Sequence, residues 1–282
     1  MRKPNKSPPK DRKPKPPHGK ASHGQNRAPG QTRPPRPENR REKPENWIYG
    51  LHAIEAALAN PRRKLHRAVL TARAAEALGP KLAGRVRVEP ADIEAIARLL
   101  PPGAVHQGAA LSCDPLPGRD LDEVLAEQKE GRRIVLVLDQ LSDPHNVGAI
   151  LRTAAAFAVT AVVVQDRHAP PQSGALTKAA SGAMEIVPYV EVVNIARALD
   201  KLGEAGFWRI ALAGDGQEPI AQAAAQGDIA LVIGSEGDGI RRLVREHCDT
   251  AAFIPIDKAM ESLNVSNAAA IALYEIRRTQ DP

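Results

Sequence analysis

One uninterrupted apolar run limits the folds open to this chain. Residues Ile134-Val135-Leu136-Val137-Leu138 carry no polar side chain, so a strand formed here would be buried on both faces, as the strands of parallel sheets are. After this run, strand-length apolar segments alternate with segments of helical periodicity up to the C-terminus. This alternation predicts an α/β fold in which helices cover a parallel sheet. We expect further strands at 161–164, 186–190, 208–212, 229–233 and 251–254, and helices near 147–158, 173–182, 194–204, 239–246 and 265–278.

A smaller α/β module is expected before this sheet. Order should begin near Trp47, and the apolar residues within 51–58 recur at helical spacing. Prolines and a glycine within 115–118 mark a boundary after the module. The expected organisation is therefore a module at 46–114, a linker at 115–130 and a larger domain at 131–282. Within the module we expect strands at 68–70, 86–88 and 109–113, and helices at 73–78 and 91–100.

The N-terminal segment, residues 1–45, differs in composition from the rest. It holds 11 of the 25 prolines, and its 14 Lys/Arg against 4 Asp/Glu give it a charge of +10. Taken from totals of 39 and 33, this leaves 25 basic and 29 acidic residues beyond it, a charge of −4. A segment with so little to bury is expected to stay disordered. It is interpreted as a basic arm for the phosphate backbone of a nucleic acid, the alternative being a solubilising tail without a defined partner.

Several classes of protein are excluded by what the sequence lacks. The two cysteines, Cys113 and Cys248, lie far apart, which excludes a disulfide framework and a cysteine zinc site, and no metal is expected. No apolar run reaches the roughly 18–20 residues that a membrane span needs. No apolar segment follows the basic N-terminus as it would in a secretory signal. A soluble, cytoplasmic protein is expected.

The first candidate site segment runs from Asp139 to Arg152. The strand ends here, a turn with Pro144 follows, and a helix is expected to begin near Asn146, which is a good N-cap residue. The junction between a strand's carboxyl end and a helix N-terminus is where open α/β sheets place ligands. Arg152 falls beside the apolar stripe of this helix. Taken alone, the segment is equally compatible with an ordinary cap and a solvent-facing arginine.

The second segment is the glycine-rich loop Gly234-Ser235-Glu236-Gly237-Asp238-Gly239, which follows the apolar strand at 229–233. Its glycines allow a tight turn and the close approach of a ligand. The spacing is GxxGxG and not the GxGxxG of dinucleotide-binding folds, and the expected acidic residue about 20 positions later is missing. A nucleotide-binding metabolic enzyme is therefore disfavoured. As a lone motif, the loop would be an ordinary turn.

The third segment places four polar residues just before an alanine-rich helix: Ser262, Asn264, Ser266 and Asn267. Each residue alone could be a helix cap. Four within six positions exceed what capping requires. Some of them are therefore expected to face a ligand or a partner.

Together, these segments resemble the three signature motifs of SpoU/TrmH-type RNA ribose 2′-O-methyltransferases, in the same order and spacing. The matching parts are Asn146 to Arg152, the 233–237 loop and Ser262-Leu263-Asn264-Val265-Ser266. The module at 46–114, with Ile48-Tyr49-Gly50-Leu51-His52-Ala53 and Val105-His106-Gln107-Gly108, is similar to the L30e-like RNA-binding domain of the branch that modifies a guanosine in 23S ribosomal RNA.

This resemblance implies a deep trefoil knot in residues 131–282, which the periodicity alone does not predict. It implies S-adenosylmethionine as cofactor, held in the knot largely by backbone groups around Gly234, Ile254, Ile256 and Leu263. It also implies a homodimer with the active site near the interface. RNA is the implied partner, 23S ribosomal RNA before tRNA, with neither DNA nor a membrane.

The resemblance also implies catalytic roles for five residues. Arg152 would handle the target ribose and its phosphate; because an Arg pKa lies above about 12, electrostatic activation is preferred over proton abstraction. Asn146 would orient Arg152 or the ribose, and Glu236 would hydrogen-bond within the site or hold the arginine. Ser262 and Asn264 would shape the pocket for cofactor and target.

Two further functions compete with the expected 23S ribosomal RNA (guanosine-2′-O-)-methyltransferase activity. One is methylation of a tRNA ribose, which the module and the basic tail disfavour only by analogy. The other is a non-catalytic RNA-binding or ribosome-assembly role, against which the intact Arg152, Glu236 and Asn264 argue. One departure from the family concerns 257–260, which lacks the glycine that many relatives carry shortly after the Ile-Pro-aliphatic step.

Overall fold

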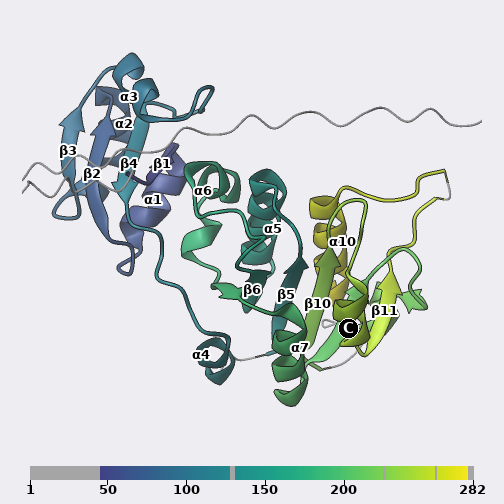
Figure 1. The fold of residues 1–282 in the computed structure, drawn as a ribbon. Helices are drawn as coiled ribbons and strands as arrows, with labels where there is room; N and C mark the ends of the chain where they lie inside the picture. Colours follow the sequence, from purple (N-terminus) through teal and green to yellow (C-terminus); the bar gives the residue numbers. More distant parts are fainter. Residues whose placement is uncertain (1–44, 128–130, 225–226, 258, 279–282) are drawn as a thin grey trace, which may run out of the picture. The chain divides into compact units, whose positions relative to one another are not determined.

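The computed structural model describes residues 45–127, 131–224, 227–257 and 259–278. Of the tail at 1–45, for which disorder and an RNA-binding role are expected, residues 1–44 lie outside the described residues. Glu45 is described and pairs with Arg67 at 2.8 Å. The described residues, from 45 onward, belong to one compact unit. Figure 1 shows that this unit contains two sheets, one from the first part of the chain and one from the second.

The first sheet is mixed, with the strand order β1-β4-β2-β3 in the described part of the chain. Its core forms because the apolar residues of the first helix, including Ile54 and Leu58, pack onto the buried face of the central strands. The predicted elements of this module are confirmed, with small shifts at their ends. They are α1 (Leu51–Ala59), β2 (Leu65–Leu70), α2 (Ala72–Leu78), β3 (Arg87–Pro90), α3 (Ile93–Leu99) and β4 (Ala109–Cys113). Two short elements were not predicted, β1 (Trp47–Tyr49) and η1 (Gly79–Leu82).

The second sheet confirms the predicted parallel α/β architecture. Its strand order is β7-β6-β5-β10-β8-β11-β9, and every neighbouring pair is parallel within the described residues. The run that predicted a doubly buried strand is β5, and all six of its residues are buried. The strands are β5 (Ile134–Asp139), β6 (Ala161–Gln165), β7 (Tyr189–Val192), β8 (Trp208–Leu212), β9 (Glu218–Pro219), β10 (Ile229–Gly234) and β11 (Thr250–Phe253).

Helices cover both faces of this sheet (Figure 1). Alternate residues of β5 point to opposite sides, so Leu136 joins one core and Val135 the other. One face packs against α5 (Pro144–Ala156), α6 (Gly174–Ala180), α8 (Ile220–Ala223) and α10 (Val265–Arg278). The other packs against α4 (Leu121–Ala126), α7 (Ile195–Glu204) and α9 (Arg242–Glu246). Because Leu121 and Val124 are buried in this second core, α4 is packed on the larger domain although it lies within the predicted linker.

The start of α5 corrects one prediction. The N-cap is Asp143, whose carboxylate accepts hydrogen bonds from the backbone N–H groups of His145 and Asn146. Pro144 occupies the first turn, where its missing N–H costs nothing. Asn146 is therefore inside the first turn and not the cap. Its side chain is free of a capping role and available for other contacts.

Two smaller differences concern a shifted strand and two short elements. The strand expected at 186–190 lies at Tyr189–Val192, because a short helical turn, η2 (Ala183–Glu185), precedes it. The short elements β9 and α8 carry too few residues to show a period and were not predicted. In the described residues, no helix is long and apolar enough to cross a membrane.

A buried ion pair joins the N-terminal module to the larger domain. Arg63 Nε donates to Glu185 Oε1 at 3.0 Å, and the two side chains are only 1% and 3% exposed. Asn60 Nδ2 donates to the second carboxylate oxygen at 2.7 Å, and Arg63 Nη1 donates to the Asp114 carbonyl at 3.0 Å. The Arg63 guanidinium and the Glu185 carboxylate are therefore paired with each other while buried away from water.

We expect Glu185→Ala to lower the free energy of unfolding by about 3–5 kcal/mol, because it leaves the Arg63 guanidinium buried without its carboxylate. Urea denaturation of the two proteins measures the difference. Glu94→Ala is the matched control, since Glu94 pairs with Arg98 at 83% and 77% exposure. This control should change stability by less than about 1 kcal/mol. Equal effects of both substitutions would contradict the assignment of a stabilising network to Glu185.

Candidate functional site

Three of the five predicted catalytic residues meet at the carboxyl end of the parallel sheet. Glu236 Oε1 accepts hydrogen bonds from Asn264 Nδ2 at 2.7 Å and from Asn146 Nδ2 at 3.4 Å. Asn264 Nδ2 lies 3.1 Å from Asn146 Oδ1. The backbone N–H of Val265 also donates to the same carboxylate oxygen, at 3.1 Å. One oxygen of Glu236 thus joins residues from all three sequence motifs.

Asn264 also caps the last helix, α10. Its Oδ1 accepts from the Ser266 N–H at 3.0 Å, from Ser266 Oγ at 2.6 Å and from the Asn267 N–H at 3.4 Å. An asparagine side chain in this position satisfies N–H groups that a helix leaves unpaired. Capping therefore accounts for Ser266 and Asn267. Ser262 takes no part in it and lines the cavity described below.

The glycine-rich loop folds back on itself immediately after β10. Ser235 and Gly239 exchange backbone hydrogen bonds of 3.2 and 3.1 Å. A Cβ atom added at Gly234 would lie 2.1 Å from the carbonyl carbon of Gly239 and 2.3 Å from the backbone nitrogen of Ile240. These are backbone atoms that cannot rotate away, so only glycine fits at this position.

A cavity of about 590 Å³ opens between this loop and the segment before α10. All four predicted cofactor residues line it, and so do Glu236 and Ser262. Further lining residues that the sequence motifs missed include Leu212, Gly214 and Asp215. Their signal was the end of the apolar strand at 208–212, because carboxyl ends of parallel strands lie at one edge of a sheet. The four predicted cofactor residues that line the cavity are Gly234, Ile254, Ile256 and Leu263.

A buried carboxylate fixes the far end of the loop. Asp139, fully buried at the end of β5, accepts from the Arg241 backbone N–H at 2.9 Å and from the Arg241 Nε and Nη2 at 2.9 and 2.6 Å. Arg241 Nη2 also donates to Gln165 Oε1 at 2.9 Å. A paired, two-pronged contact of this kind is geometrically specific. It holds the chain after the loop against the strands that carry the site.

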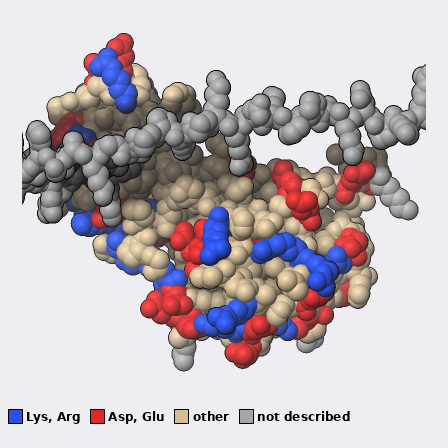
Figure 2. Space-filling model, in the orientation of Figure 1, with Lys and Arg blue, Asp and Glu red and all other residues tan. Residues whose placement is uncertain are grey.

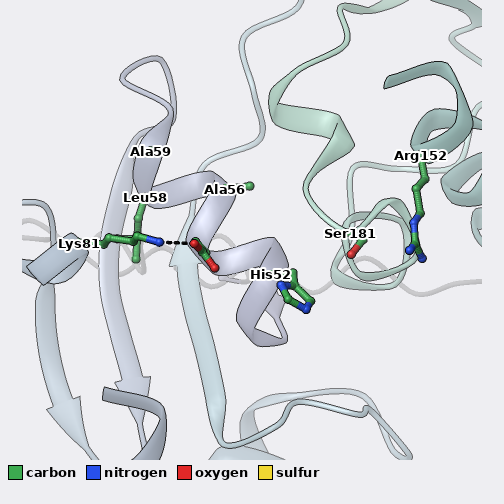
Figure 3. Close-up of a pocket in the computed structure, with 8 residues that line it drawn as sticks. His52, Ala56, Leu58, Ala59, Lys81, Arg152 and Ser181 are labelled. Carbon is green, nitrogen blue, oxygen red and sulfur yellow. Dashed lines mark hydrogen bonds and ion pairs between the residues drawn. The ribbon is translucent and has the colours of Figure 1, made fainter. Parts of the chain in front are cut away.

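Arg152 lies outside this cluster. It projects from α5 into a separate cleft of about 720 Å³, where Figure 3 shows His52 of α1 on one side and Ser181 and Arg152 on the other. Its guanidinium forms no hydrogen bond or ion pair with any residue that the structure describes. The predicted contact with Glu236 or Asn146 is therefore absent from the described part of this chain.

The two cysteines are unsuited to nucleophilic or metal chemistry. Burial raises the pKa of the Cys113 thiol to about 11 and that of Cys248 to about 12. A thiol with such a pKa stays protonated near neutral pH. Over the residues described, no cluster of three or more His, Cys, Asp or Glu side chains could hold a metal ion.

Comparison with known proteins assigns the chain to a family. The model of the SpoU rRNA Methylase family matches residues 133–274. A 23S rRNA (guanosine-2′-O-)-methyltransferase RlmB from Vibrio vulnificus is 40% identical over 240 residues, which cover 82% of this chain and 96% of that protein. The chain belongs to the SpoU rRNA methylase family. The predicted resemblance, and with it the assignment to an enzyme family, is confirmed.

The SpoU assignment extends to the module before the catalytic sheet. A second family model, described as RNA 2′-O ribose methyltransferase substrate binding, matches residues 47–118. Among solved structures, a putative RNA methyltransferase of the TrmH family from Porphyromonas gingivalis is similar with a TM-score of 0.65 at 25% identity, covering 83% of this chain and 90% of that one. The SpoU methyltransferase AviRb from Streptomyces viridochromogenes, in complex with AdoMet, has the same fold with a TM-score of 0.69 at 21% identity, covering 83% and 90%.

Proposed function

We propose that this chain transfers a methyl group from S-adenosylmethionine to the ribose 2′-hydroxyl of a guanosine in 23S ribosomal RNA. The observation that carries the proposal is the single Glu236 oxygen that joins Asn146, Asn264 and the start of α10 at the rim of the cavity. This arrangement brings together the residues by which the chain resembles ribose methyltransferases. The RlmB relatives, which act on a 23S rRNA guanosine by name, supply the substrate class.

The cavity suits S-adenosylmethionine. Ile254, Ile256 and Leu263 offer apolar side chains for an adenine ring, and the bare backbone at Gly234 allows close approach. Four carboxylates line the cavity, those of Asp215, Glu236, Asp238 and Glu261, against one arginine, Arg245, which pairs with Asp215 at 2.8 Å. The remaining excess of negative charge favours a positively charged ligand. When bound, this cofactor supplies the electrophilic methyl group. The chain's own residues supply alignment and charge.

The protein's contribution to the reaction is positioning and electrostatics. Asn146 and Asn264, tied to Glu236, hold the rim of the cavity in one arrangement and orient the target ribose. Within one chain Arg152 faces a separate cleft. In the proposed homodimer, whose active site lies near the interface, Arg152 draws the ribose and its phosphate by charge and lowers the cost of the developing alkoxide. A guanidinium offers five N–H donors and no acceptor, so Arg152 is assigned charge stabilisation and not removal of the hydroxyl proton. Ser262 shapes the mouth of the cavity.

Features of the whole molecule belong to the same proposal. Residues 131–282 form the trefoil-knotted catalytic domain, which the insertion of β10 between β5 and β8 and the packing of α10 on α5 support. Residues 46–114 form the L30e-like module for RNA, and 115–130 connect the two. The enzyme works in the cytoplasm as a homodimer, for which the exposed Ile271 and Tyr274 on α10 offer an apolar face.

The basic tail adds RNA affinity. Figure 2 shows acidic and basic side chains interspersed on the visible face of the described residues, while the excess of positive charge lies in residues 1–45. Deletion of 1–45 should weaken RNA binding and flatten its dependence on salt, because fewer counterions are released. Binding of ribosomal RNA measured at several salt concentrations tests this. An unchanged salt slope would rule out the arm, and the tail would then be only solubilising.

The test of the function is transfer of labelled methyl groups from S-adenosylmethionine to RNA from cells that lack this gene, followed by mapping of 2′-O-methylation. We expect label at one position, a guanosine of 23S ribosomal RNA. Label in tRNA alone would keep the reaction and overturn the substrate. With no label in either RNA and no cofactor binding, the chain would be a non-catalytic RNA-binding protein.

A further inference from the structure

The cleft that contains Arg152 has walls from two different parts of the chain. His52, Glu55 and Ala56 come from α1 of the N-terminal module, while Arg152 and Ser181 come from the larger domain (Figure 3). Its volume of about 720 Å³ lies within the range of roughly 300–1,000 Å³ typical of ligand sites. It is distinct from the cavity beside Gly234, with which it shares no lining residue.

The two walls are held in a fixed relation. The buried Arg63–Glu185 pair lies on one side, and Lys178 Nζ donates to Gln107 Oε1 at 2.9 Å on another. Glycines allow close packing between them: a Cβ at Gly182 would lie 2.7 Å from the Ala56 Cβ, and one at Gly174 would lie 2.5 Å from the Trp47 carbonyl oxygen. The cleft therefore belongs to a packed interface between the N-terminal module and the larger domain.

The cleft's exposed polar groups suit a sugar-phosphate chain. Arg152 is exposed and unpaired among the described residues, and a guanidinium is well matched to phosphate. His52 is exposed on the opposite wall, and Ser181 adds a hydroxyl. Lys81 is paired with Glu55 at the outer end, so the unpaired positive charge is concentrated at Arg152.

We propose that this cleft binds the RNA strand next to the target nucleotide, and that His52 contacts the backbone of that strand from the module's side. This rests on the proposed function, because the target ribose is taken to lie near Arg152. Phosphate and sugar contacts set the position and register of a nucleic acid without reading its sequence. His52 is thus a residue that places the target strand relative to Arg152.

The test compares His52→Ala with the parent on an unmodified 23S ribosomal RNA transcript. We expect kcat/KM for the RNA to fall about tenfold, as loss of one hydrogen bond to a charged group implies, with the affinity for S-adenosylmethionine unchanged. His52→Gln, which keeps a hydrogen-bond donor, should restore most of the loss. The matched control is His66→Ala, an exposed histidine of the same module that pairs with Asp114 outside the cleft. It should stay within about twofold of the parent.

Binding of the same RNA to each variant, measured without the cofactor, separates this inference from the proposed function. If the parent binds but does not methylate the RNA while His52→Ala weakens binding, the cleft stands and the function falls. If the parent methylates the RNA and His52→Ala equals it in both kcat/KM and binding, the cleft assignment is overturned. Photo-cross-links from thiouridine-containing RNA to the peptide 51–59 would support the cleft, and cross-links confined to peptides that do not line the cleft would overturn it.

Discussion

Arg152→Ala is expected to reduce the rate of methyl transfer by about 10²–10³-fold, the usual effect of removing one group that stabilises developing charge. Arg152 is exposed and forms no ion pair with the described residues, so its removal should leave the fold intact. It does not line the cavity beside Gly234, so the affinity for S-adenosylmethionine should stay within about twofold of the parent. Single-turnover transfer of labelled methyl groups and calorimetric titration of the cofactor measure the two effects.

Two further variants sharpen this test. Arg152→Lys keeps the charge but loses the planar fork of the guanidinium, so it should recover part of the rate. Arg197→Ala, an exposed arginine on α7 across the sheet, is the matched control and should act as the parent does. A rate for Arg152→Ala equal to that of the Arg197 variant would show that Arg152 has no part in catalysis.

Gly234→Ala, in contrast to Arg152→Ala, should lower the affinity for the cofactor. Its new Cβ would lie 2.1 Å from the Gly239 carbonyl carbon and 2.2 Å from its oxygen, so the loop must open at its closing hydrogen bonds. Overpacking of this kind costs about 1–3 kcal/mol, and the loop supplies much of the cavity wall. We expect the dissociation constant for S-adenosylmethionine to rise about ten- to hundredfold.

RNA binding by Gly234→Ala should be retained, because the module at 46–114 and the cleft at Arg152 do not contact the loop's cavity. Gly118→Ala is the matched control, since a Cβ there meets no atom within 4 Å. Cofactor titration at a temperature where both variants are folded separates the local effect from loss of stability. An unchanged cofactor affinity in Gly234→Ala would place the cofactor outside this cavity.

The sequence predicted most of the regular elements because their signal is local. The pattern of apolar residues within a segment shows whether one or both of its faces are buried. This holds for the strands at 134–138 and 109–113 and for the helix at 265–278. The errors lie where the signal is short or belongs to a cap. Asp143, and not Asn146, caps α5. Both residues have side chains able to cap a helix, one before Pro144 and one after it, and the geometry of the turn selects the first.

The candidate site was predictable in its parts and not in its assembly. Motif composition identified Asn146, Glu236 and Asn264, but their contacts depend on strand order. The insertion of β10 between β5 and β8 brings the glycine loop beside the end of β5, although the two are about a hundred positions apart in the chain. Local periodicity holds no information about which strands become neighbours.

The sequence by itself therefore determined the α/β class, the positions of the elements and the residue types able to hold a cofactor and a ribose. Only the tertiary structure decided that Arg152 faces α1 and His52 across a cleft, away from Glu236. It also decided that Glu185 is buried against Arg63. The reason is physical: periodicity reports whether a residue is buried, whereas the partner that a side chain meets is set by packing between segments far apart in the chain.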